Sequence, residues 1–122
     1  MTETALNETR VFESAEALAQ GGAEWLCALA QASSRDFAVC LSGGSTPRRL
    51  YEALATPAMA VRFPWQRVHW FWGDERFVPH DDPESNYRMV REALLSRVPI
   101  PAENIHPVPT EGLSPVSDPA AA

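Results

Sequence analysis

Two short apolar runs, each ending at a glycine-containing polar turn, constrain the fold of this chain most strongly. Phe37–Leu41 and Val68–Trp72 are almost entirely apolar, which is the pattern of strands covered on both faces. The second run begins about 30 residues after the first, as in a strand–helix–strand unit. The strands of such a unit are parallel, so their carboxyl ends lie at the same edge of the sheet. The sequence therefore predicts an α/β fold built on a parallel sheet.

Three helices are predicted from capping residues that precede apolar side chains at helical spacing. Ser14 is the expected cap of the first helix, and Ser85 that of the third. Thr46 is the expected cap of the second, with Pro47 at its first position. The apolar stripes of the three helices are Leu18, Gly22, Trp25, Leu26 and Leu29; Leu50, Tyr51 and Leu54; and Tyr87, Val90, Leu94 and Val98. Val11-Phe12 is predicted to form a short strand before the first helix.

The charge balance excludes two classes of partner. Ten basic residues, all of them arginine, stand against sixteen acidic ones, which gives a formal net charge of −6. No dense cationic surface is available to bind nucleic acid or an anionic membrane. The acidic N-terminus does not have the pattern of a signal peptide, and no apolar run approaches the ~20 residues of a membrane span. We therefore expect a cytoplasmic protein.

The cysteines and histidines lack the spacing of a metal site. Cys27 and Cys40 lie in apolar stretches without a Cys-x-x-Cys pattern, so two buried, reduced thiols are expected. His69 is expected in the core, His80 in an acidic loop and His106 in a proline-rich segment; none is favoured as a ligand or a catalytic group. The aromatic side chains expected in the core and its connections are Trp65, Trp70, Phe71 and Trp72.

The turn after the first apolar run has the chemistry of a phosphate site. Adjacent glycines allow the backbone to approach an anion closely, and the free amides at a helix N-terminus favour negative charge. The residues expected to contact phosphate are Ser42, Gly43, Gly44, Ser45 and Thr46, with Arg48 in the first helical turn. The spacing of a dinucleotide fingerprint or a P-loop is absent, which disfavours a nucleotide. The alternative is an ordinary, well-capped turn between strand and helix.

The turn after the second apolar run carries two carboxylates and a guanidinium. Side chains alternate in direction at a strand end, so Asp74 and Arg76 are expected to face one side and Glu75 the other. An aspartate there can accept hydrogen bonds from sugar hydroxyls, and an arginine can stabilise an oxyanion or a phosphate. The alternative is a solvated salt bridge within a loop.

The last two dozen residues are rich in proline, which disfavours a buried helix or a central strand. Ile105–Val108 is predicted as at most a short extended piece. We therefore predict one α/β domain over residues 1–106 and a flexible Pro/Ala-rich tail over residues 107–122.

Three motifs, in order and spacing, resemble the 6-phosphogluconolactonase family of the glucosamine-6-phosphate isomerase/deaminase-like superfamily. They are Leu41–Pro47 followed by Leu50-Tyr51, Trp72–Arg76 followed by Val78-Pro79, and Asp82–Tyr87. The resemblance extends from about Val11 to His106. It implies a Rossmann-like, three-layer α/β fold and hydrolysis of 6-phosphogluconolactone to 6-phosphogluconate, in the oxidative pentose phosphate pathway, without a metal or organic cofactor.

The resemblance also implies roles for individual residues. The Ser42–Thr46 turn would contact the sugar phosphate together with Arg48 and Asn86, while Asp74 and Arg76 would be the catalytic residues at the lactone end. Members of the family are usually much longer, and their second half carries an Asp-Gly-His segment with the expected general base. Nothing like that segment occurs here.

Three hypotheses follow from this departure. The first is an incomplete, N-terminal portion of the family domain, inactive alone because it lacks the base. The second is a non-catalytic module that binds sugar phosphates, and the third is a sugar-phosphate isomerase or deaminase relative.

Overall fold

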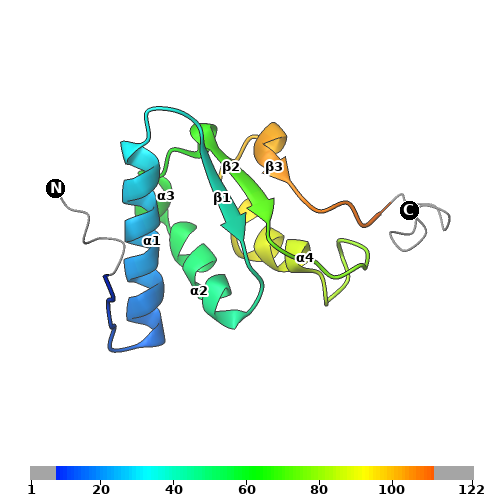
Figure 1. Ribbon diagram of the computed structural model, residues 1–122, viewed down its shortest axis with the longest axis horizontal. Coiled ribbons are helices and arrows are strands. Elements are labelled where there is room, and N and C mark those ends of the chain that lie inside the picture. The colour runs from blue at the N-terminus through cyan, green and yellow to red at the C-terminus, as the bar shows by residue number, and fades with distance from the viewer. Residues whose placement is uncertain (1–7, 112–122) are drawn as a thin grey trace.

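The structure, a computed structural model, describes residues 8–111. Helices alternate along the chain with the three strands of one sheet (Figure 1). In chain order they are α1 (Ala15–Ala32), β1 (Phe37–Leu41), α2 (Ser45–Leu54), α3 (Pro57–Ala60), η2 (Trp65–Arg67), β2 (Val68–Trp72), α4 (Asn86–Val90), η3 (Arg91–Leu95), η4 (Ala102–Asn104) and β3 (Ile105–His106). Among the described residues, no helix has the length and apolar character needed to cross a membrane.

The sheet confirms the predicted parallel pairing of the two apolar runs. The strands are ordered β1-β2-β3, and β1 pairs with β2 in parallel from Phe37 opposite Val68 to Leu41 opposite Trp72. β3 pairs in parallel with β2 and lies within the piece predicted as extended. Both predicted polar turns therefore leave the sheet at the same edge.

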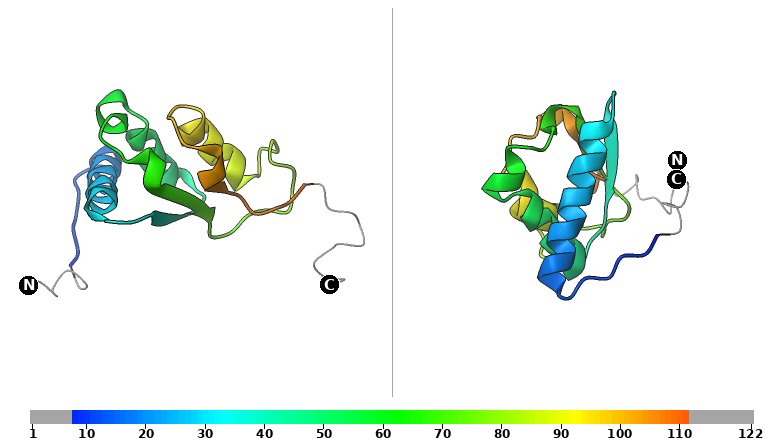
Figure 2. Two further views of the ribbon diagram at one scale, coloured as in Figure 1. Left: turned by 90° about the horizontal axis from the view of Figure 1, so that it is seen from above. Right: turned by 90° about the vertical axis from the view of Figure 1, so that its left-hand side faces the viewer.

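The helices of the described chain cover one face of the sheet (Figure 2). Alternate side chains of β2, namely Val68, Trp70 and Trp72, are buried beneath them, whereas Phe71 on the opposite face is 41% exposed. Cys40, opposite Phe71 in the register, is exposed as well. The prediction that both faces of these strands are covered is thus wrong for residues 8–111, and so is the predicted burial of Cys40 and Phe71. The parallel Rossmann-like sheet is confirmed, as a partial domain.

Helix α1 packs through small side chains rather than through its large ones. Its buried residues are Ala19, Ala23, Cys27 and Ala30. Small residues allow close approach to α2, the helix with which α1 has its main contact. The predicted stripe lies on the neighbouring face, and Trp25 within it is 58% exposed. Leu26 of that stripe is packed against the core, whereas Leu18 and Leu29 are exposed. Apolar spacing therefore identified the helix correctly, but the predicted stripe coincides only in part with the face that packs.

The segment before α1 is not the predicted strand. Ser14 caps α1 as predicted, because its hydroxyl accepts a hydrogen bond from the Ala17 N–H at 3.0 Å. The ring of Phe12 folds over the helix at Gly21, where a Cβ would lie 2.6 Å from the Phe12 Cζ. The glycine that weakens the helix locally therefore makes room for an aromatic ring.

Candidate functional site

The two predicted turns meet at the carboxyl ends of β1 and β2. The Gly73 N–H donates to the Leu41 carbonyl at 2.9 Å, which continues the pairing one step beyond the strands. In parallel α/β sheets this edge is where ligands bind. Sequence reasoning had placed both turns here, and the structure brings them into contact.

Asn86 joins the turns. Its side-chain Nδ2 donates to the Asp74 carbonyl at 3.1 Å, and its side chain is packed against the Gly43 backbone, where a Cβ would overlap the amide oxygen and lie 2.8 Å from its Cγ. Asn86 is only 9% exposed. The packing of Asn86 therefore requires a residue without a side chain at position 43. This requirement is separate from the sequence-based expectation that a glycine here lets a ligand approach the backbone.

Ser42 is fixed by Tyr51, which sequence reasoning had assigned to an apolar stripe and to the first family motif but not to the site. The Tyr51 hydroxyl donates to the Ser42 carbonyl at 2.8 Å and accepts from the Ser42 N–H at 2.9 Å. Burial raises the pKa of Tyr51, so the hydroxyl stays protonated at neutral pH and retains its donor. Tyr51 thereby holds the start of the turn against α2.

Replacing Tyr51 with phenylalanine is expected to lower the free energy of unfolding by about 2 kcal/mol, because two hydrogen bonds are lost and the Ser42 backbone groups lose their partner. Urea unfolding followed by circular dichroism measures this change. The Thr56→Val variant is a control, since it loses one exposed hydroxyl bond, to the Ala53 carbonyl, and should change stability by less. Equal effects would show that Tyr51 does not hold the turn.

The N-terminus of α2 differs from the prediction. The helix begins at Ser45, with Gly44 as its N-cap at a φ of 108°, and no side chain caps it. A left-handed φ of this kind favours glycine. Thr46 is therefore not the cap and Pro47 is not the first helical residue. The uncapped end leaves the Ser45 and Thr46 amides without a side-chain acceptor, as a phosphate site requires.

A cavity of about 350 Å³ lies where the two turns meet α2 and α4. Its lining residues are Gly44, Ser45, Arg48, Arg76, Pro83, Glu84, Ser85, Asn86 and Met89. Five predicted site residues thus share one cavity, namely Gly44, Ser45, Arg48, Arg76 and Asn86. The lining does not include Ser42, Gly43, Thr46 or Asp74. Of these four, Gly43 contacts the cavity residue Asn86, and Asp74 reaches it through its backbone carbonyl.

Both arginines of the cavity are paired only weakly. Arg48 lies 3.1 Å from Glu52, with both side chains more than 40% exposed. Arg76 lies 3.4 Å from Glu84, with side chains 57% and 70% exposed. Such surface pairs contribute 0 to about 1 kcal/mol. An anion entering the cavity can therefore attract both guanidinium groups away from their carboxylates.

Glu75, which sequence reasoning had not chosen as a site residue, receives four hydrogen bonds. Its Oε1 accepts from the N–H groups of Asn86 at 2.6 Å and Arg76 at 2.9 Å. Its Oε2 accepts from the Tyr87 N–H at 2.8 Å and the Ser85 hydroxyl at 3.2 Å. Burial raises the pKa of Glu75, but these hydrogen bonds lower it by more, so the pKa lies below its ordinary value. The Glu75 side chain thus ties the turn after β2 to the start of α4. Among the described residues, Glu75 takes part in hydrogen bonds and in none of the salt bridges.

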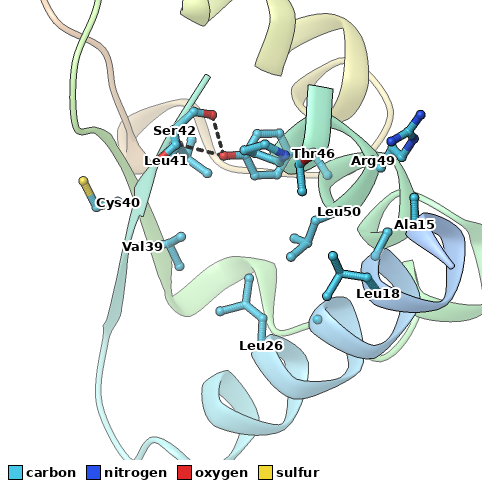
Figure 3. Close-up of a pocket in the computed structure, with 14 residues that line it drawn as sticks. Ala15, Leu18, Leu26, Val39, Cys40, Leu41, Ser42, Thr46, Arg49 and Leu50 are labelled. Carbon is cyan, nitrogen blue, oxygen red and sulfur yellow. Dashed lines mark hydrogen bonds between the residues drawn. The ribbon is translucent and has the colours of Figure 1, made fainter. Parts of the chain in front are cut away.

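A slightly larger pocket of about 390 Å³ lies between α1, β1 and α2 (Figure 3). Its walls are mostly aliphatic, with Leu18, Leu26, Val39 and Leu50 pointing toward it, and Arg49 stands at one side. Ser42 and Thr46 belong to this lining. Because converging polar groups are needed to orient a sugar phosphate, the smaller, charged cavity is the better candidate site.

None of the three histidines lines the charged cavity. His69 is half-buried on the uncovered sheet face, where its ring nitrogens face His106 Nε2 at 3.0 Å and Asp36 Oδ2 at 3.1 Å. Its predicted place in the core is therefore wrong. His80 Nε2 lies 3.1 Å from the Val108 carbonyl. Within residues 8–111, no group of three or more potential ligand side chains is arranged to hold a metal.

Most of the chain, including all the residues that line the charged cavity, matches a known protein family. The model of the family described as "Glucosamine-6-phosphate isomerases/6-phosphogluconolactonase" matches residues 13–122. The chain belongs to this family. The family resemblance drawn from the three motifs is thus confirmed.

Individual family members give the same assignment. The 6-phosphogluconolactonase of Nostoc sp. is 60% identical over 74 residues, covering 61% of this chain and 29% of the relative. That of Synechocystis sp. is 54% identical over 80 residues, covering 66% of this chain and 32% of the relative. The chain therefore spans about 30% of the length of these curated relatives.

Solved structures of the family agree with the fold. The structure of a devB protein is 38% identical, with a TM-score of 0.79, and the match covers 85% of this chain and 43% of the other. The 6-phosphogluconolactonase of Trypanosoma brucei is 30% identical, with a TM-score of 0.74 and coverages of 87% and 41%. A monomeric glucosamine-6-phosphate deaminase, 18% identical with a TM-score of 0.72, shows the shared fold alone.

Proposed function

We propose that this chain supplies the phosphosugar-binding part of a 6-phosphogluconolactonase, which hydrolyses 6-phosphogluconolactone to 6-phosphogluconate in the cytoplasm. The observation that carries the proposal is the cavity itself, in which the uncapped start of α2 faces the same space as Arg48, Arg76 and Asn86. These groups suit a small phosphorylated sugar, because amide donors and guanidinium forks are the protein groups that bind phosphate best.

In the proposed binding mode, the phosphate lies at the N-terminus of α2. The amide of Ser45, which lines the cavity, donates to its oxygens and Arg48 adds positive charge. Arg76, from the turn after β2, reaches the sugar end. The Asn86 side chain keeps the two turns at a fixed separation through its bond to the Asp74 carbonyl.

In the reaction itself, water adds to the lactone carbonyl and the bond between that carbon and the ring oxygen breaks. Of the two protons of the water, one goes to a general base and the other to the ring oxygen, which leaves a carboxylate. Arg76 would stabilise the negative charge that develops on the carbonyl oxygen. Asp74 is exposed in the turn after β2, and we propose that its carboxylate accepts hydrogen bonds from the sugar hydroxyls. A general base is also needed, and we propose that in the relatives it lies in the portion that this chain does not span.

Binding of 6-phosphogluconate, measured by isothermal titration calorimetry, tests the proposed site. Arg76→Ala is expected to weaken binding about 10- to 100-fold, since a charge-assisted hydrogen bond contributes roughly 1.5–3 kcal/mol. Arg35→Ala is the matched control, because Arg35 is exposed and is not part of the cavity lining. Absence of binding by the unmodified chain, or equal binding by both variants, would contradict the proposal.

A non-catalytic sugar-phosphate-binding module is the second candidate, favoured by the observation that no histidine lines the cavity. Hydrolysis of freshly prepared 6-phosphogluconolactone separates the two. Turnover by the purified chain at an enzyme's rate would show that a base from elsewhere is not required. Our proposal predicts that this chain alone binds the ligand without turnover. Turnover should appear when the remaining portion of a longer family member is added as a separate chain.

A further inference from the structure

Glu75 occupies a position that the proposed function does not use. Four donors converge on its carboxylate: the backbone N–H groups of Arg76, Asn86 and Tyr87, and the Ser85 hydroxyl. A carboxylate has about four lone-pair sites, so its accepting capacity is filled by protein. No acceptor position is left for a ligand, and a direct role in binding substrate is excluded.

Helix capping alone does not account for this arrangement. Helix α4 already has an N-cap, because the Ser85 hydroxyl accepts from the Arg88 N–H at 3.2 Å. Glu75 satisfies the two remaining amides of the first turn, those of Asn86 and Tyr87, from a loop about ten residues earlier in the chain. The start of α4 is therefore closed to a ligand phosphate, unlike the uncapped start of α2.

The same carboxylate also fixes the loop from which it comes. Its bond to the Arg76 N–H restricts the backbone beside Arg76, whose guanidinium points to Glu84 on the cavity wall rather than to Glu75. The bond from the Asn86 N–H to the Glu75 carboxylate likewise fixes the backbone of Asn86, which also lines the cavity. One side chain outside the cavity lining thus holds the backbones of two residues within it.

We propose that Glu75 is a positioning residue, which locks the Arg76 turn onto the first turn of α4 and so sets where Arg76 and Asn86 stand in the cavity. This proposal rests on the proposed function for its ligand, 6-phosphogluconate. The consequence for binding follows from geometry, since small misplacements of binding groups cost affinity steeply.

The test is the Glu75→Gln variant, in which an NH₂ group replaces one accepting oxygen and faces donors instead of accepting from them. The control is Glu24→Gln, which removes a carboxylate of lowered pKa from α1, where it pairs with Arg62 outside the cavity lining. We expect Glu75→Gln to raise the Kd for 6-phosphogluconate about tenfold in calorimetry, while Glu24→Gln leaves it within twofold.

Proton–nitrogen NMR spectra provide the readout that a merely structural role would not move. In the folded Glu75→Gln variant, the Asn86 and Tyr87 amide resonances should shift upfield as their carboxylate acceptor is lost, and the Arg76 Nε–H and Asn86 Nδ2 resonances should move with them. A folded variant that binds within twofold of the unmodified chain, with these side-chain resonances unchanged, would overturn the proposal.

Two further outcomes are decisive. Glu75→Asp keeps the charge but shortens the side chain; if neither it nor Glu75→Gln folds, Glu75 belongs to the fold and the positioning role is overturned. If the unmodified chain binds no 6-phosphogluconate, the proposed function fails, while the Arg76 and Asn86 side-chain resonances still decide the positioning role. Movement of these resonances in folded Glu75→Gln supports it, and their constancy overturns it.

Discussion

Replacing Gly43 with alanine is expected to lower the free energy of unfolding by about 3 kcal/mol and to abolish measurable binding of 6-phosphogluconate. A Cβ at this position would overlap the Asn86 amide oxygen and lie 2.8 Å from its Cγ. Asn86 has little room to yield, because it is 9% exposed and its Nδ2 is bonded to the Asp74 carbonyl. The clash would therefore separate the two turns that form the cavity. Calorimetry and urea unfolding measure the two effects.

The chain offers a matched control for this substitution. At Gly21 a Cβ would lie 2.6 Å from the Phe12 Cζ, but the Phe12 ring is 37% exposed and can move aside. Gly21→Ala should leave binding unchanged and can raise stability by up to about 1 kcal/mol through helix propensity.

A double variant tests whether the clash itself is the cause. Adding Asn86→Ala to Gly43→Ala removes the group that the new methyl would strike, so the pair should lose less stability than the sum of the single variants. Strict additivity, or a Gly43→Ala variant as stable as Gly21→Ala, would show that the contact is unimportant.

Replacing Arg67 with alanine is expected to destabilise the fold by about 2–3 kcal/mol. The last carbonyls of a helix need partners from outside it, and α1 carries no basic residue in its last turn. Arg67 supplies them from the segment before β2: its guanidinium donates to the carbonyls of Ser33 at 2.6 Å, Ala30 at 3.2 Å and Arg35 at 3.2 Å. Its loss would leave the Ser33 carbonyl without its donor, while the Ala30 and Arg35 carbonyls would keep only their bonds from the Ser33 N–H and the Ser33 hydroxyl. The contact that ties the end of α1 to the segment before β2 would be lost. Urea unfolding of the purified variant measures the effect.

Arg62→Ala is the matched control for this second prediction. Arg62 pairs with Glu24 at 2.6 Å, but both side chains are nearly half exposed, so its loss should cost no more than about 1 kcal/mol. Arg67→Lys should recover only part of the stability, because an ammonium group lacks the planar fork that spans several carbonyls. A full recovery in Arg67→Lys, or equal losses at Arg62 and Arg67, would be evidence against the capping role.

Much of the candidate site was predictable because it depends on local chemistry at strand ends. Parallel strands place their carboxyl ends together, so two polar turns after two apolar runs had to meet. Arg48 and Arg76 were chosen on that ground, and both line the cavity. Asn86 was chosen through the family resemblance, and it lies there as well.

The contacts that hold the site together were not predictable in the same way. Glu75 and Tyr51 act through bonds to backbone groups about ten residues away, and no periodicity marks such pairs. Glu75 looked like one charge in a polar loop. A glutamate at a strand end, followed by a serine-capped helix ten residues later, is the signal that could have suggested the bond.

The sequence by itself determined the strand–helix–strand unit, the parallel pairing and the two turns, because these follow from apolar runs, glycines and capping residues read along the chain. Tertiary structure alone decided which face each element buries. Alanines of α1 face α2 because small side chains allow close helix packing, and Phe71 and Cys40 are exposed because the described helices all lie on the other side of the sheet. Burial depends on what packs opposite a residue, and a residue's neighbours in sequence do not specify that.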